Sequence, residues 1–285
     1  MSTDQHTADT GEAAAAAPSP EAPAPLVALR GVTKTFGPVQ ALTDVDLDVP
    51  VGAVTALAGD NGAGKSVLIK TVAGLWQPDA GEIRWEGRPV RLRSPRQAED
   101  LGITTIYQDL ALCDNLDIVQ NMFLGREILR HGLLDEVVME QDARRTLQEL
   151  SVTSVLSIRQ PVLSLSGGQR QSVAVAKALM TNSKLVIMDE PTAALGVSQT
   201  RTVLELIRRL AGRGVAVIVI SHNINDVFSV ADRIAILRLG RLVASGPLAE
   251  FDPQTVVEYM TLGSSARATA GRTQPPTAVQ EAHGE

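Results

Sequence analysis

Residues 53–66 read AVTALAGDNGAGKS, an apolar run followed by a glycine-rich turn that ends in Lys65 and Ser66. The turn, residues 59–66, fits the spacing GxxxxGKS/T of a phosphate-binding loop. Glycines allow backbone N–H groups to converge on phosphate oxygens, and the positive end of a helix that begins near Lys65 strengthens the attraction. The stretch therefore predicts a buried strand, a loop that binds nucleotide phosphates, and a helix.

We expect this phosphate loop to contact ATP along its whole length. Lys65 is expected to reach the β- and γ-phosphates, and the Ser66 hydroxyl is expected to bind Mg²⁺. A glycine-rich turn could match the spacing by chance, but the strand before it and the helix after it argue against that alternative. The predicted ATP-binding residues of this segment are Gly59, Asp60, Asn61, Gly62, Ala63, Gly64, Lys65, Ser66 and Val67.

Two acids end the next informative stretch, residues 185–190, which read LVIMDE. Four apolar residues followed by Asp189 and Glu190 are typical of a buried strand whose carboxyl end opens on a nucleotide. Asp189 is expected to hold Mg²⁺ through water, and Glu190 to orient or deprotonate the attacking water. A solvated turn is the alternative, and the phosphate loop upstream favours the catalytic interpretation.

Two further side chains are expected at the same site. His222 follows the β-branched run 215–220, which we expect to be the next strand of the same sheet, so its imidazole should lie near the γ-phosphate. Gln108 stands where strand-like sequence gives way to a helical segment, and its amide is expected to contact Mg²⁺ or the attacking water. The predicted catalytic residues are Glu190, His222, Gln108 and Lys65, and the predicted metal ligands are Ser66, Gln108 and Asp189.

Composition limits the classes of protein to which the chain can belong. Of its 285 residues, 44% are hydrophobic and only 3% aromatic, so aliphatic side chains must fill its core. The net charge is −6, and no basic stripe offers a surface for nucleic acid. Cys113 is the only cysteine, which excludes an internal disulfide, and we expect it to be buried. No apolar run reaches the about 20 residues that cross a membrane, and no secretory signal is present, so we expect a cytoplasmic protein.

The order of elements predicts an α/β fold. Residues 1–26 and 264–285 are expected to be disordered tails, because neither has enough large apolar residues to offset the entropy of ordering. Residues 27–263 are expected to form one domain, with antiparallel strands first and a helical insertion at about 109–165. Apolar, β-branched strands that alternate with helices then indicate a parallel sheet covered on both faces. The expected later elements are helices at 167–180 and 198–211 and strands at 185–188, 215–220, 233–237 and 241–244.

A third motif, residues 165–169, reads LSGGQ at a predicted helix start. Ser166 and the two glycines present a hydroxyl and N–H groups to an anion, with the helix dipole behind them. A site that already holds phosphate on its own loop has no need of a second such cradle. Together with the phosphate loop and the acidic strand end, this motif makes the chain resemble the ATP-binding cassette (ABC) family.

The resemblance covers about residues 26–263 and implies both a fold and a chemistry. It implies a P-loop NTPase cassette with a mixed, largely parallel sheet core, an antiparallel β-subdomain and a helical signature subdomain. It implies ATP and Mg²⁺ as ligands, Gln108 as the hinge toward a membrane partner, and His222 as the switch histidine. Phe36 matches the position where an aromatic ring stacks on adenine, with a core phenylalanine as the alternative. The signature residues Ser166, Gly167, Gly168 and Gln169 are implied to contact ATP bound by a second cassette.

The sequence departs from the family pattern in one consequential place. After Glu190 the pattern runs to a Leu-Asp pair, whereas residues 193–196 read AALG, so a carboxylate that usually bridges the two sites is missing. Coupling between the sites is the property that this departure puts in doubt. Val67 likewise stands where threonine is commoner, but Ser66, the implied metal ligand, is retained.

Several stretches look like the ATPase subunits of bacterial simple-sugar importers of the ribose, xylose and fructose type. They are residues 59–62, 107–116, 123–127, 194–196 and 221–223. This likeness implies an ATPase on the cytoplasmic face of the membrane, bound to permease subunits that an extracytoplasmic sugar-binding protein supplies. Because the chain holds one cassette, a homodimer or a partner cassette must complete the two ATP sites. The alternatives are another cargo, a non-transport cassette ATPase that acts on DNA or ribosomes, or a regulatory module without catalysis.

Overall fold

The computed structural model describes residues 25–150, 152, 157–180, 182–193 and 195–264. The two expected tails, 1–26 and 264–285, lie almost entirely outside these residues. Leu26, which the predicted N-terminal tail includes, is buried, and its N–H donates to the carbonyl of Val49 at 2.8 Å. The folded domain therefore extends to this residue, because an apolar side chain next to a paired strand can join the core.

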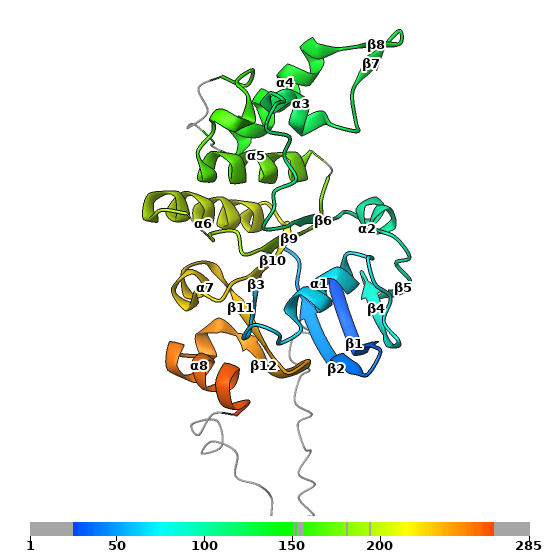
Figure 1. The fold of residues 1–285 in the computed structure, drawn as a ribbon, viewed down its shortest axis with the longest axis vertical. Coiled ribbons are helices and arrows are strands. Elements are labelled where there is room, and N and C mark those ends of the chain that lie inside the picture. The colour runs from blue at the N-terminus through cyan, green and yellow to red at the C-terminus, as the bar shows by residue number, and fades with distance from the viewer. Residues whose placement is uncertain (1–24, 151, 153–156, 181, 194, 265–285) are drawn as a thin grey trace, which may run out of the picture.

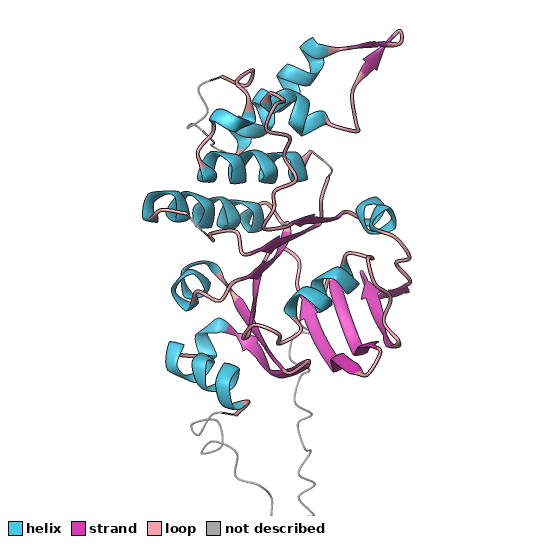
Figure 2. Cartoon of the chain, viewed as in Figure 1, coloured by secondary structure: helices cyan, strands magenta, loops and turns pink. Residues whose placement is uncertain are grey.

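A six-stranded sheet forms the centre of the molecule, in the order β12-β11-β3-β10-β9-β6 (Figures 1 and 2). Its strands from β6 to β11 run parallel to their neighbours, and β12 pairs antiparallel with β11 at one edge. The predicted parallel sheet is confirmed. The bounds are Val54–Ala58 (β3), Ile103–Ile106 (β6), Leu185–Asp189 (β9), Ala216–Ile220 (β10), Arg233–Arg238 (β11) and Arg241–Pro247 (β12).

Both faces of this sheet are covered, which explains why its strands read as continuous apolar runs. In β9, Val186 and Met188 face α5 and α6, whereas Leu185 and Ile187 face the side of α1. Helices α7 and α8 cover the same face of the sheet as α5 and α6, and they pack on β3 and β11 (Figure 1). These four β9 side chains are fully buried, and burial of such a side chain stabilises a fold by about 1.5–3 kcal/mol. The bounds are Lys65–Val72 (α1), Gly167–Leu179 (α5), Val197–Gly212 (α6), Ile224–Val230 (α7) and Pro253–Leu262 (α8).

A second sheet, antiparallel throughout, lies on the α1 side in the order β2-β1-β4-β5. In β2 the side chains of Val45, Leu47 and Val49 are buried and those between them are exposed, the alternation of a strand with one solvated face. The predicted antiparallel subdomain is confirmed. The bounds are Val27–Phe36 (β1), Val39–Val49 (β2), Ala80–Trp85 (β4) and Arg88–Val90 (β5), and α2 (Pro95–Leu101) leads from this sheet to β6.

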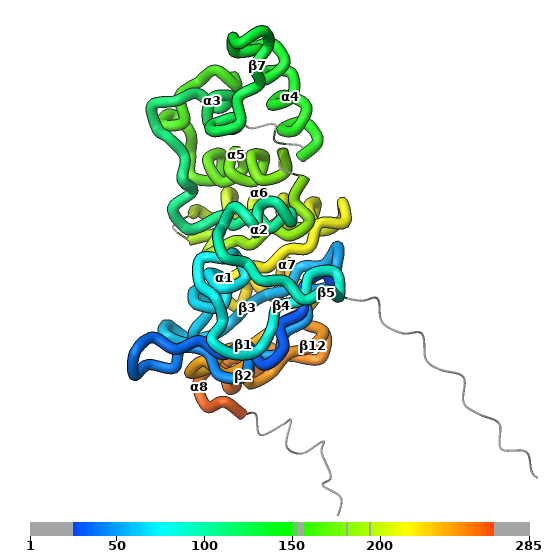
Figure 3. Tube along the Cα trace, turned by 90° about the vertical axis from the view of Figure 1, so that its right-hand side faces the viewer, coloured from blue at the N-terminus to red at the C-terminus, as the bar shows by residue number. Residues whose placement is uncertain are grey.

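The insertion after β6 is mostly helical, as the fold prediction requires, but it also holds a β-hairpin. Strands β7 (Leu129–Arg130) and β8 (Leu133–Leu134) pair around His131 and Gly132, which both have positive φ. A two-residue strand is too short for alternation to reveal it in the sequence. Figures 1 and 3 place the hairpin at the opposite end of the molecule from α8. The helical elements are α3 (Ile118–Phe123), α4 (Glu136–Glu149) and a 3₁₀ turn (Val162–Ser164) before α5.

None of the helices that the structure describes is long and apolar enough to cross a membrane.

One buried amide ties the loop that opens the insertion to α3. The Oδ1 of Asn121 accepts from the N–H of Cys113 at 2.7 Å, and its Nδ2 donates to the carbonyls of Cys113, Leu116 and Asp117 at 2.9, 3.2 and 3.0 Å. The Asn121 side chain is fully buried, so its amide replaces water for four backbone contacts. Cys113, predicted to be buried, is only partly buried, because this surface loop is held through its backbone.

Asn121→Ala is expected to lower the free energy of unfolding by about 2–4 kcal/mol, since several partly buried backbone groups lose partners that are worth about 1 kcal/mol each. Urea unfolding followed by circular dichroism measures this change. Gln141→Ala, at an exposed position of α4, is the control and should change stability by less than about 0.5 kcal/mol. If the two variants were equally stable, the amide would not hold the loop.

Candidate functional site

The phosphate loop, residues 59–66, joins the end of β3 to the start of α1. Gly59 has φ +152°, and a Cβ there would lie 2.4 Å from the carbonyl oxygen of Leu237. Gly64 has φ +104°, and a Cβ there would lie 2.7 Å from the carbonyl oxygen of Ala41. Side chains do not approach so closely, so glycine at both positions lets the loop pass between β2 and the end of β11.

The first turn of α1 leaves its backbone donors available to a ligand. Gly64 is the N-cap, and no side chain caps the helix. The N–H groups of Lys65, Ser66 and Val67 therefore have no partner within the helix, and they converge at its positive end.

The Lys65 ammonium is held at the centre of the loop. Its Nζ donates to the carbonyls of Gly59 at 2.6 Å and Asp60 at 2.9 Å. Burial lowers the pKa of Lys65, and the negative charges of Glu190 and Asp189 oppose that shift. A fixed cation next to convergent N–H groups is an arrangement that binds polyphosphate.

The two acids lie beside this loop because β10 lies between β3 and β9. Ile220 of β10 pairs with Leu57 of β3 on one side and with Asp189 of β9 on the other. The carboxyl ends of the three parallel strands therefore meet at one edge of the sheet. Burial raises the pKa of Asp189, and the adjacent charge of Glu190 raises it further.

Glu190 has a backbone conformation that the sequence does not predict. Its φ of +49° lies in the left-handed region, and its N–H donates to the carbonyl of Ile220 at 3.0 Å. Its Oε1 lies 2.8 Å from Nδ1 of His222. The Glu190 side chain is 18% exposed and that of His222 is 70% exposed, so the histidine approaches a largely buried carboxylate from the solvent side.

A second hydrogen bond between side chains links the segments that follow β9 and β10. The hydroxyl of Thr192 donates to Oδ2 of Asp226 at 2.6 Å, and Asp226 is buried in the first turn of α7. This pair holds the segment after Glu190 against the helix that follows His222. Our sequence reasoning missed Asp226, although an acid in the first helical turn after His222 is a signal that could have found it.

An open hollow of about 540 Å³ brings most of the predicted residues together. The predicted residues that line it are Asn61, Gly62, Ala63, Gly64, Lys65, Ser66, Val67, Gln108, Asp189 and Glu190. It is also lined by Val39, Gln40, Ala41, Ile220, Leu239 and Gly240, which lie in strand ends and turns without a motif. Phe36, Gly59, Asp60, His222 and the four signature residues do not line it.

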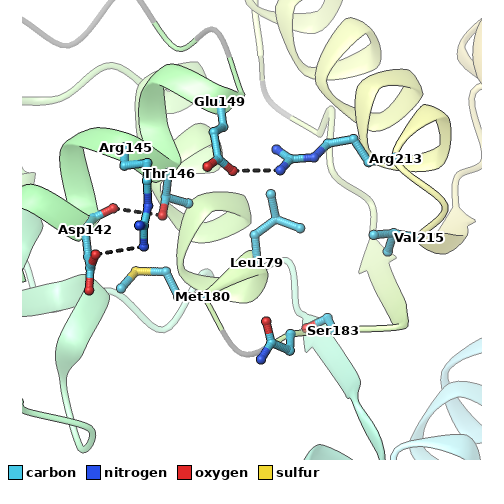
Figure 4. A pocket seen from close by; sticks show the side chains of 10 residues that line it. Asp142, Arg145, Thr146, Glu149, Leu179, Met180, Ser183, Arg213 and Val215 are labelled. Carbon is cyan, nitrogen blue, oxygen red and sulfur yellow. Dashed lines mark hydrogen bonds and ion pairs between the residues drawn. The ribbon is translucent and has the colours of Figure 1, made fainter.

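A hollow of similar size, about 560 Å³, lies between α4 and the ends of α5 and α6 (Figure 4). Its charged side chains face one another: Asp142 pairs with Arg145 at 2.8 Å, and Glu149 pairs with Arg213 at 2.6 Å. Each guanidinium therefore already has a carboxylate partner. None of the predicted site residues lines this hollow, and its balanced charges suit phosphate less well than the loop does.

The signature residues form the start of α5. The Ser166 hydroxyl accepts from the N–H of Gln169 at 3.4 Å, and the Ser166 N–H donates to Oε1 of Gln169 at 2.8 Å, which makes a capping box. A Cβ on Gly167 would lie 2.7 Å from the Leu195 side chain, and one on Gly168 would lie 3.1 Å from Cβ of Gln199. These glycines therefore also permit close packing of α5 on α6, a role that our sequence reasoning missed.

The departure from the family pattern at residues 193–196 lies at the start of α6. Gly196 is the N-cap of this helix, and no side chain accepts from its first N–H groups. An acid at an N-cap would do so. Ala194 lies outside the described residues.

Phe36 lies at the end of β1 and is 39% exposed, which excludes the alternative of a core phenylalanine. Its ring contacts Trp76, a residue that the sequence analysis did not select. The turn after Phe36 leads directly to Val39, which lines the hollow.

The residues present fit a magnesium nucleotide. Ser66 offers a hydroxyl, Gln108 an amide oxygen and Asp189 a carboxylate, and hard oxygen ligands of this kind suit Mg²⁺. At Gly59 and Gly64 a Cβ would collide with backbone atoms. Glycine at these positions lets backbone N–H groups come close to the phosphates of a nucleotide.

Comparison with known proteins agrees with this geometry. Residues 42–193 match the family model described as ABC transporter. The chain is 49% identical to the fructose import ATP-binding protein FrcA of Rhizobium meliloti, over 83% of this chain and 94% of that protein. It is 43% identical to the xylose/arabinose import ATP-binding protein XylG of Sulfolobus acidocaldarius, over 86% and 98%. A solved dimeric structure of a post-hydrolysis state of the ATP-binding cassette MJ0796, bound to ADP and Pi, is similar with a TM-score of 0.64 at 25% identity, over 78% of this chain and 98% of that one.

Gly59→Ala is expected to weaken ATP binding at least about tenfold and to lower the Tm, because the added Cβ meets the Leu237 carbonyl and the loop must move. Gly212→Ala, at the exposed end of α6, is the matched control, since no atom of the described residues lies within 4 Å of a Cβ there. Equilibrium dialysis with labelled ATP and thermal melts measure both effects. Equal ATP affinity in the two variants would contradict the assignment of the loop.

Proposed function

Because the chain belongs to the ABC transporter family, we propose that it is the ATP-hydrolysing subunit of an importer for a simple sugar. The observation that carries this proposal is the meeting of the phosphate loop, Asp189 and the Glu190–His222 pair at one edge of the sheet. The likeness to fructose and to xylose/arabinose import ATP-binding proteins, each matched over most of its length, supports the choice of cargo.

In this proposal the phosphates of ATP lie over the first turn of α1. The uncapped N–H groups of that turn and the Lys65 ammonium bind the β- and γ-phosphates. Ser66 and Gln108 would hold Mg²⁺, and Asp189 would hold it through water. When bound, Mg²⁺ neutralises part of the phosphate charge that builds up during attack by water.

Glu190 is the group placed to activate the attacking water. The water oxygen forms a bond to the γ-phosphorus, a water proton passes to the Glu190 carboxylate, and the bond from phosphorus to the ADP oxygen breaks. The products are ADP and phosphate. His222, with a proton on Nδ1, donates to Oε1 of Glu190 and so orients the carboxylate for this transfer.

A second cassette completes the site. The residues Ser166, Gly167, Gly168 and Gln169 do not line the hollow of their own chain, and in this proposal they contact the ATP of a partner cassette. The family membership and the similar dimeric cassette support a homodimer. ATP held between two copies then makes closure of the dimer the consequence of ATP binding. Since Gly196 has no carboxylate, the signature supplies more of the contact between the two sites.

The dimer acts on a membrane partner at the cytoplasmic face of the membrane. Residues near Gln108 and the insertion through Leu124 form the surface that binds the permease, because Gln108 lines the nucleotide hollow and the insertion follows it directly. ATP-driven closure of the cassettes draws the two permease subunits together, and hydrolysis resets them. An extracytoplasmic binding protein delivers the sugar, which does not touch this chain.

Glu190→Gln is expected to reduce ATP hydrolysis by about 10²- to 10⁴-fold, because an amide cannot take the proton of the attacking water. ATP binding should be retained, and the dimer should accumulate because its ATP is not consumed. Phosphate release, equilibrium binding and light scattering measure the three quantities. Glu99→Gln, which alters an exposed acid on α2, is the control. Unchanged phosphate release in Glu190→Gln would remove this residue from the mechanism.

Reconstitution in liposomes with the co-purified permease and binding protein tests the transport assignment. A monosaccharide is expected to stimulate phosphate release, and the same complex with Glu190→Gln is the control without turnover. Stimulation by an amino acid, a lipid or a drug instead would replace sugar as the cargo. Failure of any membrane protein to co-purify with the chain would contradict the transport role itself.

A further inference from the structure

We propose that Trp76 is a positioning residue that fixes the ring of Phe36 as the platform for the adenine of ATP. The ring centroids of the two residues are 4.8 Å apart, and their planes meet at 69°. This edge-to-face geometry is the favourable one for an aromatic pair. The inference rests on the proposed function, because it takes ATP as the substrate.

Phe36 needs such support because of its place in the fold. It ends β1 next to the turn at Gly37, and 39% of it is exposed. A side chain at an exposed strand end has few neighbours to select one rotamer. Neither Phe36 nor Trp76 belongs to the buried hydrophobic clusters of the described chain, so this pair is not part of the core.

Trp76 links the Phe36 ring to the helix that begins at the phosphate loop. The N–H groups of Leu75 and Trp76 donate to the carbonyl of Lys70 at 2.9 and 3.3 Å. The ammonium of Lys70 also lies 5.1 Å from the centre of the Trp76 ring, a cation–π contact. Since Lys70 lies in the last turn of α1, one short helix connects the base platform to the phosphate-binding end.

The segment after Trp76 also makes hydrogen bonds to the end of β1. The carboxylate of Asp79 accepts from Nζ of Lys34 at 2.8 Å and from the N–H of Thr35 at 2.7 Å. The N–H of Asp79 donates to the carbonyl of Thr33 at 2.8 Å. Lys34 in turn lies 5.4 Å from the centre of the Phe36 ring. The residues from Trp76 to Asp79 thus fix both the ring and the strand that carries it.

The pair is joined by a short turn to one part of the lining of the nucleotide hollow. Phe36 pairs with Val39 across this turn, and Val39, Gln40 and Ala41 line the hollow. In this proposal a base attached to phosphates on α1 extends past these residues to the Phe36 ring. The gain from a fixed ring is that less side-chain freedom is lost when the base stacks.

A comparison of ATP with tripolyphosphate, which lacks the base, tests this role. Trp76→Ala is expected to weaken ATP binding about two- to tenfold, the range for loss of an aromatic pair, and to leave tripolyphosphate binding unchanged. Trp76→Phe should restore most of the ATP affinity. Leu75→Ala, whose N–H makes the same bond to Lys70, is the matched control and should bind both ligands as the wild type does. The KM for ATP should rise in Trp76→Ala, with little change in kcat.

A second measurement does not require the alanine variant to fold. The chain has only two tryptophans, so in Trp85→Phe the tryptophan fluorescence comes from Trp76 alone. Its emission is expected to change on addition of ATP and not of tripolyphosphate. Unchanged ATP affinity in Trp76→Ala, an equal loss of tripolyphosphate binding, or fluorescence that responds to both ligands would overturn the positioning role. A wild-type chain that binds neither ligand would overturn the proposed function, and this inference with it.

Discussion

The pairing of β10 with β3 on one side and β9 on the other brings the parts of the site together. Parallel strands end at the same edge, so Ile220 brings the end of β3 and Asp189 into one row. Both faces of these strands are covered by helices and by the antiparallel sheet, which leaves the edge as the place where polar side chains can gather. The chemistry of the site therefore follows from strand order and burial.

Several groups at this edge have conformations that an isolated peptide would not keep. Gly59 and Gly64 lie against backbone carbonyls, Glu190 has positive φ, and the Lys65 ammonium is partly buried between carbonyl oxygens. The surrounding strands and helices maintain these conformations, because the cost of each is small compared with the burial of the sheet. The result is a preorganised set of donors and carboxylates, which lowers the reorganisation needed when charge develops during a reaction.

Two features organise the cassette. They are the two ends of helix α1 and the signature at the start of α5. The phosphate loop precedes the N-terminus of α1. Trp76 follows the C-terminus of α1, and its ring contacts the ring of Phe36. The signature at the start of α5 packs on α6 and lines no part of the hollow in its own chain. In the proposed function the signature contacts the ATP of a partner cassette, which is why assembly and ATP turnover belong together there.

The phosphate loop, the buried strands and the parallel sheet are predictable from the sequence, because they depend on local residue type and on the period of apolar residues. It also placed Asp189 and Glu190 at a strand end, since four apolar residues precede them. Three contacts between residues far apart in the sequence are visible only in the folded chain: His222 with Glu190, Asp226 with Thr192, and Trp76 with Phe36. Such pairs leave no periodic trace in the chain, because packing of whole elements selects them. The left-handed turn at Glu190 has the same origin, for its N–H is bonded to the neighbouring strand.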